Sequence, residues 1–99
     1  MIVVRRTYTP KPGCGSGLLQ LVRAAADAMA DAGFEKPVTF RTHSGYHGAV
    51  ITEQAWENIA AYEASRGQVR RTAAITAIFE QIYALLASTH HTEILERVE

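Results

Sequence analysis

The sequence predicts one α+β domain in which a four-stranded antiparallel sheet carries all of its helices on a single face. Three observations predict this class. A chain of 99 residues is too short to build two separate hydrophobic cores. Its hydrophobic periodicity changes between strand and helix in the order βαββααβ. The two middle strands are joined closely enough to form a hairpin, as in the ferredoxin-like, split βαβ arrangement.

The first strand and the first helix are marked by composition and by turn signals. Residues 2–9 are rich in β-branched and aromatic side chains, and the turn-forming segment 10–17 follows them. In residues 18–32 the apolar side chains recur at helical spacing, which predicts a helix. Ser16 suits the N-cap of this helix, and Gly33 suits its C-terminal end.

Two short segments, residues 37–43 and 48–53, predict an antiparallel hairpin. They are enriched in Val, Thr, Phe and Ile, and they flank the turn-forming residues 44–47. Side chains alternate along the first segment, so one side of that strand is apolar and the other carries Arg41 and His43. The apolar side consists of Val38, Phe40 and Thr42. We expect the apolar side to face the helices, and Arg41 and His43 to lie on the uncovered face of the sheet.

Two helices and a strand complete the predicted order. The shorter helix begins around Trp56 and ends near Gly67. The longer helix carries an apolar stripe over residues 75–86, which we interpret as core. Residues 92–98 alternate between apolar and polar side chains and predict a final strand with mixed faces.

The shorter of these helices carries both aromatic and basic side chains. Trp56, Ile59 and Tyr62 recur at helical spacing, which is more typical of core or interface residues than of a ligand-binding wall. The basic side chains are Arg66, Arg70 and Arg71. We interpret them as a solvated helix surface, because so short a cluster cannot follow a nucleic acid backbone.

Charge and composition exclude several classes of partner. Ten basic and ten acidic residues cancel, so no long-range positive field attracts nucleic acid or an anionic membrane surface. No apolar run approaches the roughly 20 residues that cross a bilayer, and residues 1–10 lack the order of a signal peptide. Cys14 is the only cysteine and cannot form an internal disulfide. We expect a cytoplasmic protein that binds neither nucleic acid nor membrane.

The uncovered face of the sheet predicts a second copy of the chain as partner. Alternation along the first strand places Arg5 and Arg6 on opposite faces, without indicating which faces the helices. A half-apolar open face on a small protein is commonly covered by a partner. Two such sheets meeting face to face would enclose a cavity. We therefore expect a homodimer, with a pocket between the sheet's free face and the edges of the helices.

Four segments of the chain resemble a known superfamily. The segments that carry the resemblance are VVRRTYTPKPG, RTHSGYHGAVITE, AWENIAAYEASRG and EILERVE, in this order and spread over nearly the whole chain. They look like the dimeric α/β-barrel proteins, especially their small NIPSNAP-like members. The resemblance implies a homodimer whose sheets form a shared barrel. Such proteins include cofactor-independent monooxygenases, haem-degrading enzymes, small-molecule isomerases and many of unknown role. No residue here matches an active-site motif of these enzymes, so none is assigned as catalytic.

The candidate ligand-binding residues are Arg41 and His43 on the predicted free face, with Tyr46 and His47 in the adjoining turn. A guanidinium group offers a two-pronged donor to an anion, and an imidazole exchanges a proton near neutral pH. Together they suit an anionic or aromatic ligand. The alternative is that these side chains line a dimer interface or contact water, as polar sheet faces often do.

The other potential ligand types form no known metal or phosphate site. Adjacent His90 and His91 point apart in an extended strand, and no zinc-ligand spacing occurs among the histidines and Cys14. The glycine-rich segment around Cys14 lacks the Lys-Ser/Thr ending of a Walker loop, so we interpret it as a flexible connection. We expect no metal and no cofactor; a haem ligand is suggested only by analogy with haem-degrading relatives.

Three functions stay open at the level of sequence. The leading one is a homodimeric small-molecule-binding protein, NIPSNAP-like, whose ligand lies between sheet and helices. The alternatives are a cofactor-independent monooxygenase-like enzyme acting on an aromatic or polyketide-like substrate, and a structural interaction module. An enzyme needs an enclosed, mostly apolar cavity of several hundred Å³ that holds a histidine or tyrosine with a shifted pKa. A binding protein needs only the cavity, and an interaction module needs neither.

Overall fold

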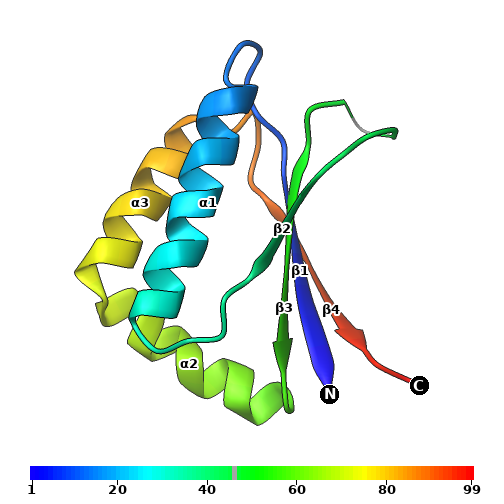
Figure 1. Cartoon of the computed structure of the whole chain (residues 1–99), viewed down its shortest axis with the longest axis vertical. Coiled ribbons are helices and arrows are strands. Elements are labelled where there is room, and N and C mark those ends of the chain that lie inside the picture. The colour runs from blue at the N-terminus through cyan, green and yellow to red at the C-terminus, as the bar shows by residue number, and fades with distance from the viewer. Residues whose placement is uncertain (46) are drawn as a thin grey trace.

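A four-stranded antiparallel sheet forms one layer of the molecule, and three helices form the other (Figure 1). The computed structural model describes residues 1–45 and 47–99. The strands are β1 (Ile2–Tyr8), β2 (Val38–Arg41), β3 (Val50–Trp56) and β4 (His91–Glu96). They lie in the order β2-β3-β1-β4, so β1 and β3 are central. The predicted α+β class, with its βαββααβ order, is confirmed.

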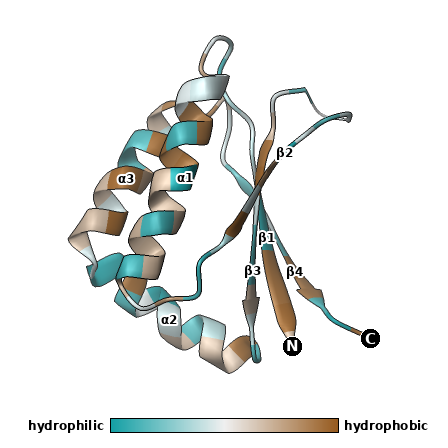
Figure 2. Cartoon of the chain, in the orientation of Figure 1, coloured by the Kyte–Doolittle hydropathy of each residue, from teal (hydrophilic) through white to brown (hydrophobic). Residues whose placement is uncertain are grey.

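The helices cover one face of the sheet (Figure 1). Helices α1 (Gly15–Asp31) and α3 (Ala73–Ala84) lie side by side over the sheet, and α2 (Ile59–Arg71) lies at the end where β1 begins. Hydrophobic and hydrophilic residues alternate along α1 and α3, as expected for helices that bury one side (Figure 2). Within residues 1–45 and 47–99, no helix is both long enough and apolar enough to span a membrane.

The ends of α1 differ in one respect from the predicted ones. The N-cap is Cys14, whose side chain makes no capping hydrogen bond, and Ser16 lies inside the helix. The predicted N-cap is therefore wrong, because the helix begins at Gly15, three residues before the start of the apolar periodicity. Gly33 follows the helix with a φ of 91°, a conformation that glycine adopts without steric strain. The predicted C-terminal end is confirmed.

The connection from β3 to α2 also differs from the prediction. β3 continues to Trp56, because its seven residues pair with the whole of β1. Asn58 then caps α2, and its Oδ1 accepts a hydrogen bond from the backbone N–H of Ala61 at 2.8 Å. The helix passes through Gly67, where the prediction ended it, because one internal glycine costs only about 1 kcal/mol. It ends at Arg71, and the backbone of its C-cap residue, Thr72, is extended.

Buried hydrophobic residues form two separate clusters between the sheet and the helices. The larger cluster joins β1 and β3 to α1 and to the end of α3, and it consists of Tyr8, Leu18, Val22, Ala25, Val50, Ile82 and Leu86. The smaller cluster joins β1 to α2 and consists of Ile2, Val4 and Tyr62, with Trp56 packed against it. The predicted apolar stripe of α3 is confirmed as core, since Ile75 and Ile82 are fully buried.

A row of polar side chains crosses the sheet between the two clusters. Of the β1 residues that share a face with Val4 and Tyr8, only Arg6 is charged. Its partners across the sheet are Thr52 on β3 and Thr92 on β4. Thr39 on β2 pairs with Thr52 and completes this polar row, which comprises Thr39, Thr52, Arg6 and Thr92. The structure thus places Arg6 on the helix-covered face and Arg5 on the free face.

Strand β2 presents the opposite face to the one that was predicted. Phe40 pairs with Ile51 on the free face, and Val38 and Phe40 are 55% and 45% exposed. Arg41 pairs with Val50, which is buried under the helices, so Arg41 lies on the helix side. The prediction was wrong because alternation separates two faces of a strand without indicating which one is covered. At this sheet edge the helices leave the inward positions of β2 partly exposed, so those positions accommodate polar side chains.

A single truncation tests this description of the core. Ile82 is fully buried in the larger cluster, whereas Ile59 on α2 is 47% exposed. We expect Ile82→Ala to lower the free energy of unfolding by about 2–5 kcal/mol, because it leaves a cavity in the core. Ile59→Ala serves as the control and should cost about 0.5 kcal/mol or less. Urea denaturation followed by circular dichroism measures both values; equal losses would contradict the core as described.

Candidate functional site

A cavity of about 300 Å³ lies between the helix-covered face of the sheet and the helices. It is lined by Arg6, Tyr8, Met29, Gln54, Trp56, Tyr62, Ser65, Arg66, Val69, Arg70, Ile75, Thr76, Phe79, Glu80, Tyr83 and His90. The buried members form its floor, and the exposed members, such as Arg66, Glu80 and Tyr83, form its mouth. This volume is at the lower end of that of small-molecule sites in proteins. The cavity lies between sheet and helices, on the helix-covered face, whereas a pocket at the free face would need a second copy of the chain and stays a prediction.

The cavity exists where the polar row separates the two hydrophobic clusters. Arg6 lies between Val4 of the smaller cluster and Tyr8 of the larger one along the same face of β1. A guanidinium group cannot complete hydrophobic packing, because burying it without hydrogen bonds is costly. The helices therefore close over the two clusters and leave space above Arg6.

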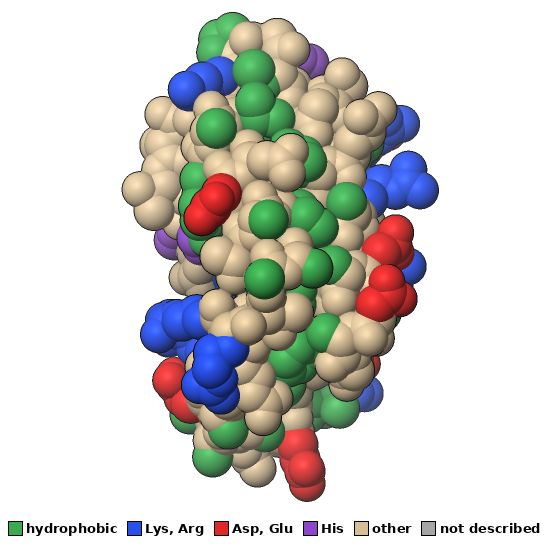
Figure 3. Space-filling view, turned by 90° about the vertical axis from the view of Figure 1, so that its left-hand side faces the viewer, with side chains coloured by type: hydrophobic (Ala, Val, Ile, Leu, Met, Phe, Trp, Pro, Cys, Tyr) green, Lys and Arg blue, Asp and Glu red, His purple; other side chains and the backbone are tan. Residues whose placement is uncertain are grey.

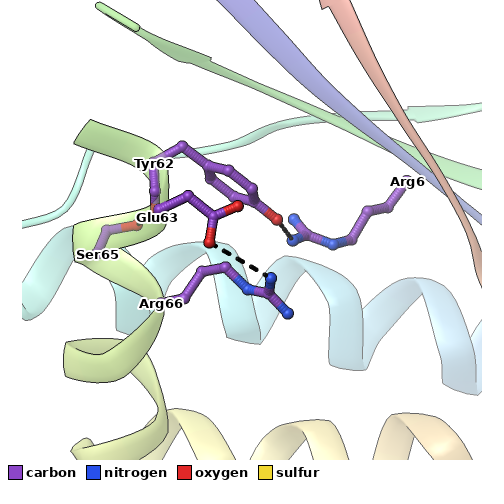
Figure 4. A network of polar contacts seen from close by, with 5 residues as sticks. All are labelled: Arg6, Tyr62, Glu63, Ser65 and Arg66. Atoms are coloured by element: carbon purple, nitrogen blue, oxygen red, sulfur yellow. Dashed lines mark hydrogen bonds and ion pairs between the residues drawn. The ribbon is translucent and has the colours of Figure 1, made fainter. Parts of the chain in front are cut away.

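Arg6 is held in place by Tyr62 from α2 (Figure 4). One terminal nitrogen of its guanidinium group donates a hydrogen bond to the phenolic oxygen of Tyr62 at 2.8 Å. The centre of the guanidinium lies 5.9 Å from the Tyr62 ring centroid, within the range of a cation–π contact. Within the described part of the chain, no carboxylate forms an ion pair with Arg6. Its positive charge is therefore available to a ligand.

Two further arginines line the mouth of the cavity. Arg66 approaches the Tyr62 ring from α2, with its guanidinium centre 5.8 Å from the ring centroid (Figure 4). Its carboxylate contact is a long one, 3.9 Å to Glu63, between two exposed side chains. Arg70 follows one turn later on the same helix. Basic side chains gather low on the helical face of the molecule, at the level of α2 (Figure 3). Arg66 and Arg70 are exposed, as the prediction of a solvated helix surface requires, and both also line the cavity, which the sequence did not indicate.

Trp56 contributes an aromatic wall and an unused hydrogen-bond donor. Its ring lies 5.9 Å from that of Tyr62, and both residues line the cavity. The indole Nε1 is buried and has no hydrogen-bond acceptor among the described residues. A buried polar atom without a partner is uncommon in native proteins and is often associated with a functional role or a bound molecule. The interpretation of Trp56 and Tyr62 as core or interface residues was therefore incomplete, since both also line the cavity.

His90 occupies the cavity wall among aromatic side chains. Its ring stacks on Tyr83 with centroids 5.9 Å apart and lies 5.3 Å from the ring of Tyr8. Burial and then the positive charge of Arg6 lower the pKa of His90 below its ordinary value of 6.5, so the imidazole is neutral at pH 7. Burial is also the main cause that raises the pKa of Tyr8 to about 12. A neutral imidazole can accept a proton or a hydrogen bond from a ligand.

The predicted ligand-binding residues lie elsewhere. Arg41 is exposed at the end of β2, and His43 and His47 are exposed in the connection from β2 to β3. Tyr46 lies outside the described residues. None of the described three lines the 300 Å³ cavity. Their role in ligand binding stays a prediction.

The fold is shared with solved structures, although no family model and no curated protein matches the sequence. An uncharacterized NIPSNAP domain protein from Burkholderia xenovorans superposes with a TM-score of 0.85 at 17% identity, over 99% of this chain and 95% of that one. A NIPSNAP family protein from Agrobacterium tumefaciens gives 0.83 at 23% identity, over 99% and 86%. An antibiotic biosynthesis monooxygenase gives 0.77 at 17%, over the whole of both chains. The resemblance to these proteins is thus confirmed at the level of the fold.

The titration of His90 tests the geometry of the cavity. We expect its imidazole protons, followed by NMR and assigned by comparison with His90→Gln, to titrate with a midpoint below 6.5. Arg6→Gln should raise this midpoint, because the Arg6 charge disfavours the imidazolium. In the pH window between the folded pKa and 6.5 the unfolded chain binds more protons, so this group makes stability increase with pH. A midpoint at or above 6.5 would contradict the described burial of His90.

Proposed function

We propose that this protein is a homodimeric small-molecule-binding protein whose ligand lies in the cavity between the sheet and the helices. The observation that carries the proposal is the lining of that cavity. It combines aromatic walls with hydrogen-bond donors that have few acceptors within the described chain, namely the Arg6 guanidinium and the Trp56 indole. Mostly apolar concave sites with a few convergent polar groups are typical of ligand pockets. An interaction module has no need of such a cavity.

The free face of the sheet supports the homodimer. Its rows contain Val38 and Phe40 on β2 and Ile51 on β3, together with Val3 on β1 and Leu95 on β4. Val38 and Phe40 are large hydrophobic side chains left about half exposed. Burying them against a second copy stabilises both chains by about 25 cal/mol for each Å² removed from water. A face-to-face pair is also the arrangement that the resemblance to dimeric α/β-barrel proteins implies.

The charged residues on this face are compatible with burial in an interface. Arg5 Nε donates to Glu53 Oε2 at 2.8 Å, and both side chains are already about one-third exposed. Glu93 lies opposite Arg5 on the next strand. The three residues form a row of alternating charge within one protomer, so that Arg5 has a partner before any second copy binds. Paired charges are less costly to bury than isolated ones.

A charge introduced into the free face tests the dimer. We expect the native protein to be a dimer in native mass spectrometry at about 10 μM, and Phe40→Glu to be a monomer, because a carboxylate cannot be buried there unpaired. Ile59→Glu is the matched control, since Ile59 is exposed to the same degree but lies on α2, away from the free face. It should stay dimeric. A monomeric native protein would contradict the homodimer.

A cavity-filling substitution tests the binding function. Val69 lines the cavity and is half-buried, whereas the adjacent Gln68 is exposed and does not line it. We expect Val69→Phe to weaken binding of the aromatic probe 2-naphthoate at least about tenfold in isothermal titration calorimetry, because the larger side chain occupies the space of the ligand. Gln68→Phe should leave the dissociation constant unchanged. Equal binding by both variants would place the probe outside this cavity.

A cofactor-independent oxygenase acting on an aromatic substrate is the second candidate function. Its specific support is His90, a neutral imidazole in the cavity wall that can take a proton from a phenolic or enolic substrate. The fold similarity to an antibiotic biosynthesis monooxygenase is consistent with this candidate. Oxygen uptake stimulated by the protein in the presence of polycyclic phenols favours the enzyme. Ligand binding without oxygen uptake favours the binding protein.

A further inference from the structure

We propose that the ligand of the cavity is a small organic anion, an aromatic or aliphatic carboxylate whose acidic group pairs with Arg6 and faces Arg66. This inference rests on the proposed binding function and specifies the chemical class of ligand. It follows from the charge of the lining, the geometry of the two arginines and the apolar character of the remaining surface.

The lining of the cavity is positive although the chain as a whole is neutral. The whole sequence contains ten basic and ten acidic residues. The cavity, in contrast, is lined by three guanidinium groups, those of Arg6, Arg66 and Arg70, and by one carboxylate, that of Glu80. An uneven charge inside a low-dielectric cleft focuses the electrostatic field and raises the local concentration of oppositely charged molecules.

Arg6 is the group that most needs an anion. Its side chain is half-buried on the helix-covered face of the sheet, and it donates a hydrogen bond to a neutral phenol, that of Tyr62. The guanidinium has five N–H donors, so within the described residues most of them have no protein acceptor. A carboxylate accepts two parallel N–H bonds from a guanidinium, which is stronger than a neutral contact.

Arg66 brings a second positive charge to the same place. The guanidinium centres of Arg6 and Arg66 lie 5.9 and 5.8 Å from the same Tyr62 ring centroid, one reaching it from the sheet and the other from α2 (Figure 4). Two like charges that share one cleft repel each other. Glu63 relieves this repulsion weakly, because its contact with Arg66 is long and exposed. An anion between the two arginines removes it.

The remainder of the lining selects an organic acid over inorganic phosphate. Met29 and Ile75 are buried in the cavity floor, and Phe79 and Val69 are half-buried beside them. Contact between these side chains and the apolar part of a ligand favours binding, and an inorganic ion has no such part. A volume of about 300 Å³ accommodates one or two rings or a short aliphatic chain.

A matched pair of probes separates charge from shape. The probes are 2-naphthoate and 2-naphthalenemethanol, which share their ring system and differ in that only the first is an anion at pH 7.5. We expect isothermal titration calorimetry of the native protein to give at least about tenfold tighter binding for the naphthoate, because hydrogen bonds to a charged group are worth more than neutral ones. Inorganic phosphate at the same concentration should not compete.

Variants of Arg6 test whether this residue causes the preference for the anionic probe. Arg6→Gln should reduce the tenfold preference to about one, and Arg6→Lys, which keeps the charge but loses the planar fork, should give an intermediate ratio. The control is Arg71→Gln, an arginine on the same helix as Arg66 that does not line the cavity. It should keep the full preference. Arg6→Lys also provides a test if Arg6→Gln fails to fold, which circular dichroism would reveal.

The outcomes distinguish this inference from the proposed function. Equal affinity for the two probes overturns the organic-anion inference and leaves the cavity as a binding site for neutral molecules. An unchanged preference for the naphthoate in folded Arg6→Gln overturns the pairing of the acidic group with Arg6, and an unchanged preference in Arg6→Lys overturns the two-pronged contact with its guanidinium. Competition by phosphate at the cavity also overturns it, in favour of an inorganic anion. No binding of either probe at 1 mM contradicts the binding function itself. A preference that depends on Arg6 and not on Arg71 supports the inference.

Discussion

The position of Arg6 on the helix-covered face of the central strand β1, between two buried clusters, is the constraint on which the candidate site depends. The hydrophobic core would be continuous along β1 if this residue were apolar, because Val4 and Tyr8 on either side belong to buried clusters. The polar row of Thr39, Thr52, Arg6 and Thr92 separates the two clusters, and Arg6 is the member of this row that lines the cavity. α2 then supplies Tyr62 as hydrogen-bond acceptor and Arg66 as a second cation. A loss of packing in the core is thus coupled to the formation of a charged site.

The two faces of the sheet suit the two proposed partners differently. The helix-covered face holds the cavity and its arginines, whereas the free face holds exposed hydrophobic side chains such as Phe40 and a charge pair between Arg5 and Glu53. Neighbouring arginines in the sequence therefore have different environments: Arg5 is neutralised within its own sheet, and Arg6 is not. A second copy of the chain suits the free face, and a small anion suits the cavity. Because the two sites lie on opposite sides of one sheet, each can be altered separately.

Element order and fold class could be predicted from sequence, because they depend on local periodicity and turn residues. The orientation of β2 could not, since Val38 and Phe40 alternate with polar residues whichever face the helices cover. That error led to Arg41 and His43 as site candidates. The cavity residues come from strands and helices far apart in the chain, so their convergence depends on tertiary packing. One signal of the site was present in the sequence. Arg5 and Arg6 lie on opposite faces of the first strand, so one of them had to place its charge among the apolar residues under the helices.

The most direct test of the account is the indole N–H resonance of Trp56 in a proton–nitrogen NMR correlation spectrum during titration with 2-naphthoate. The chain contains one tryptophan, so the spectrum contains one such signal, and it arises from the cavity wall. The account predicts that this resonance shifts with saturation on addition of the acid and remains unshifted in the Val69→Phe variant. A resonance that stays in place while the acid binds elsewhere, shown by shifts confined to the free face of the sheet, would contradict the cavity as the binding site.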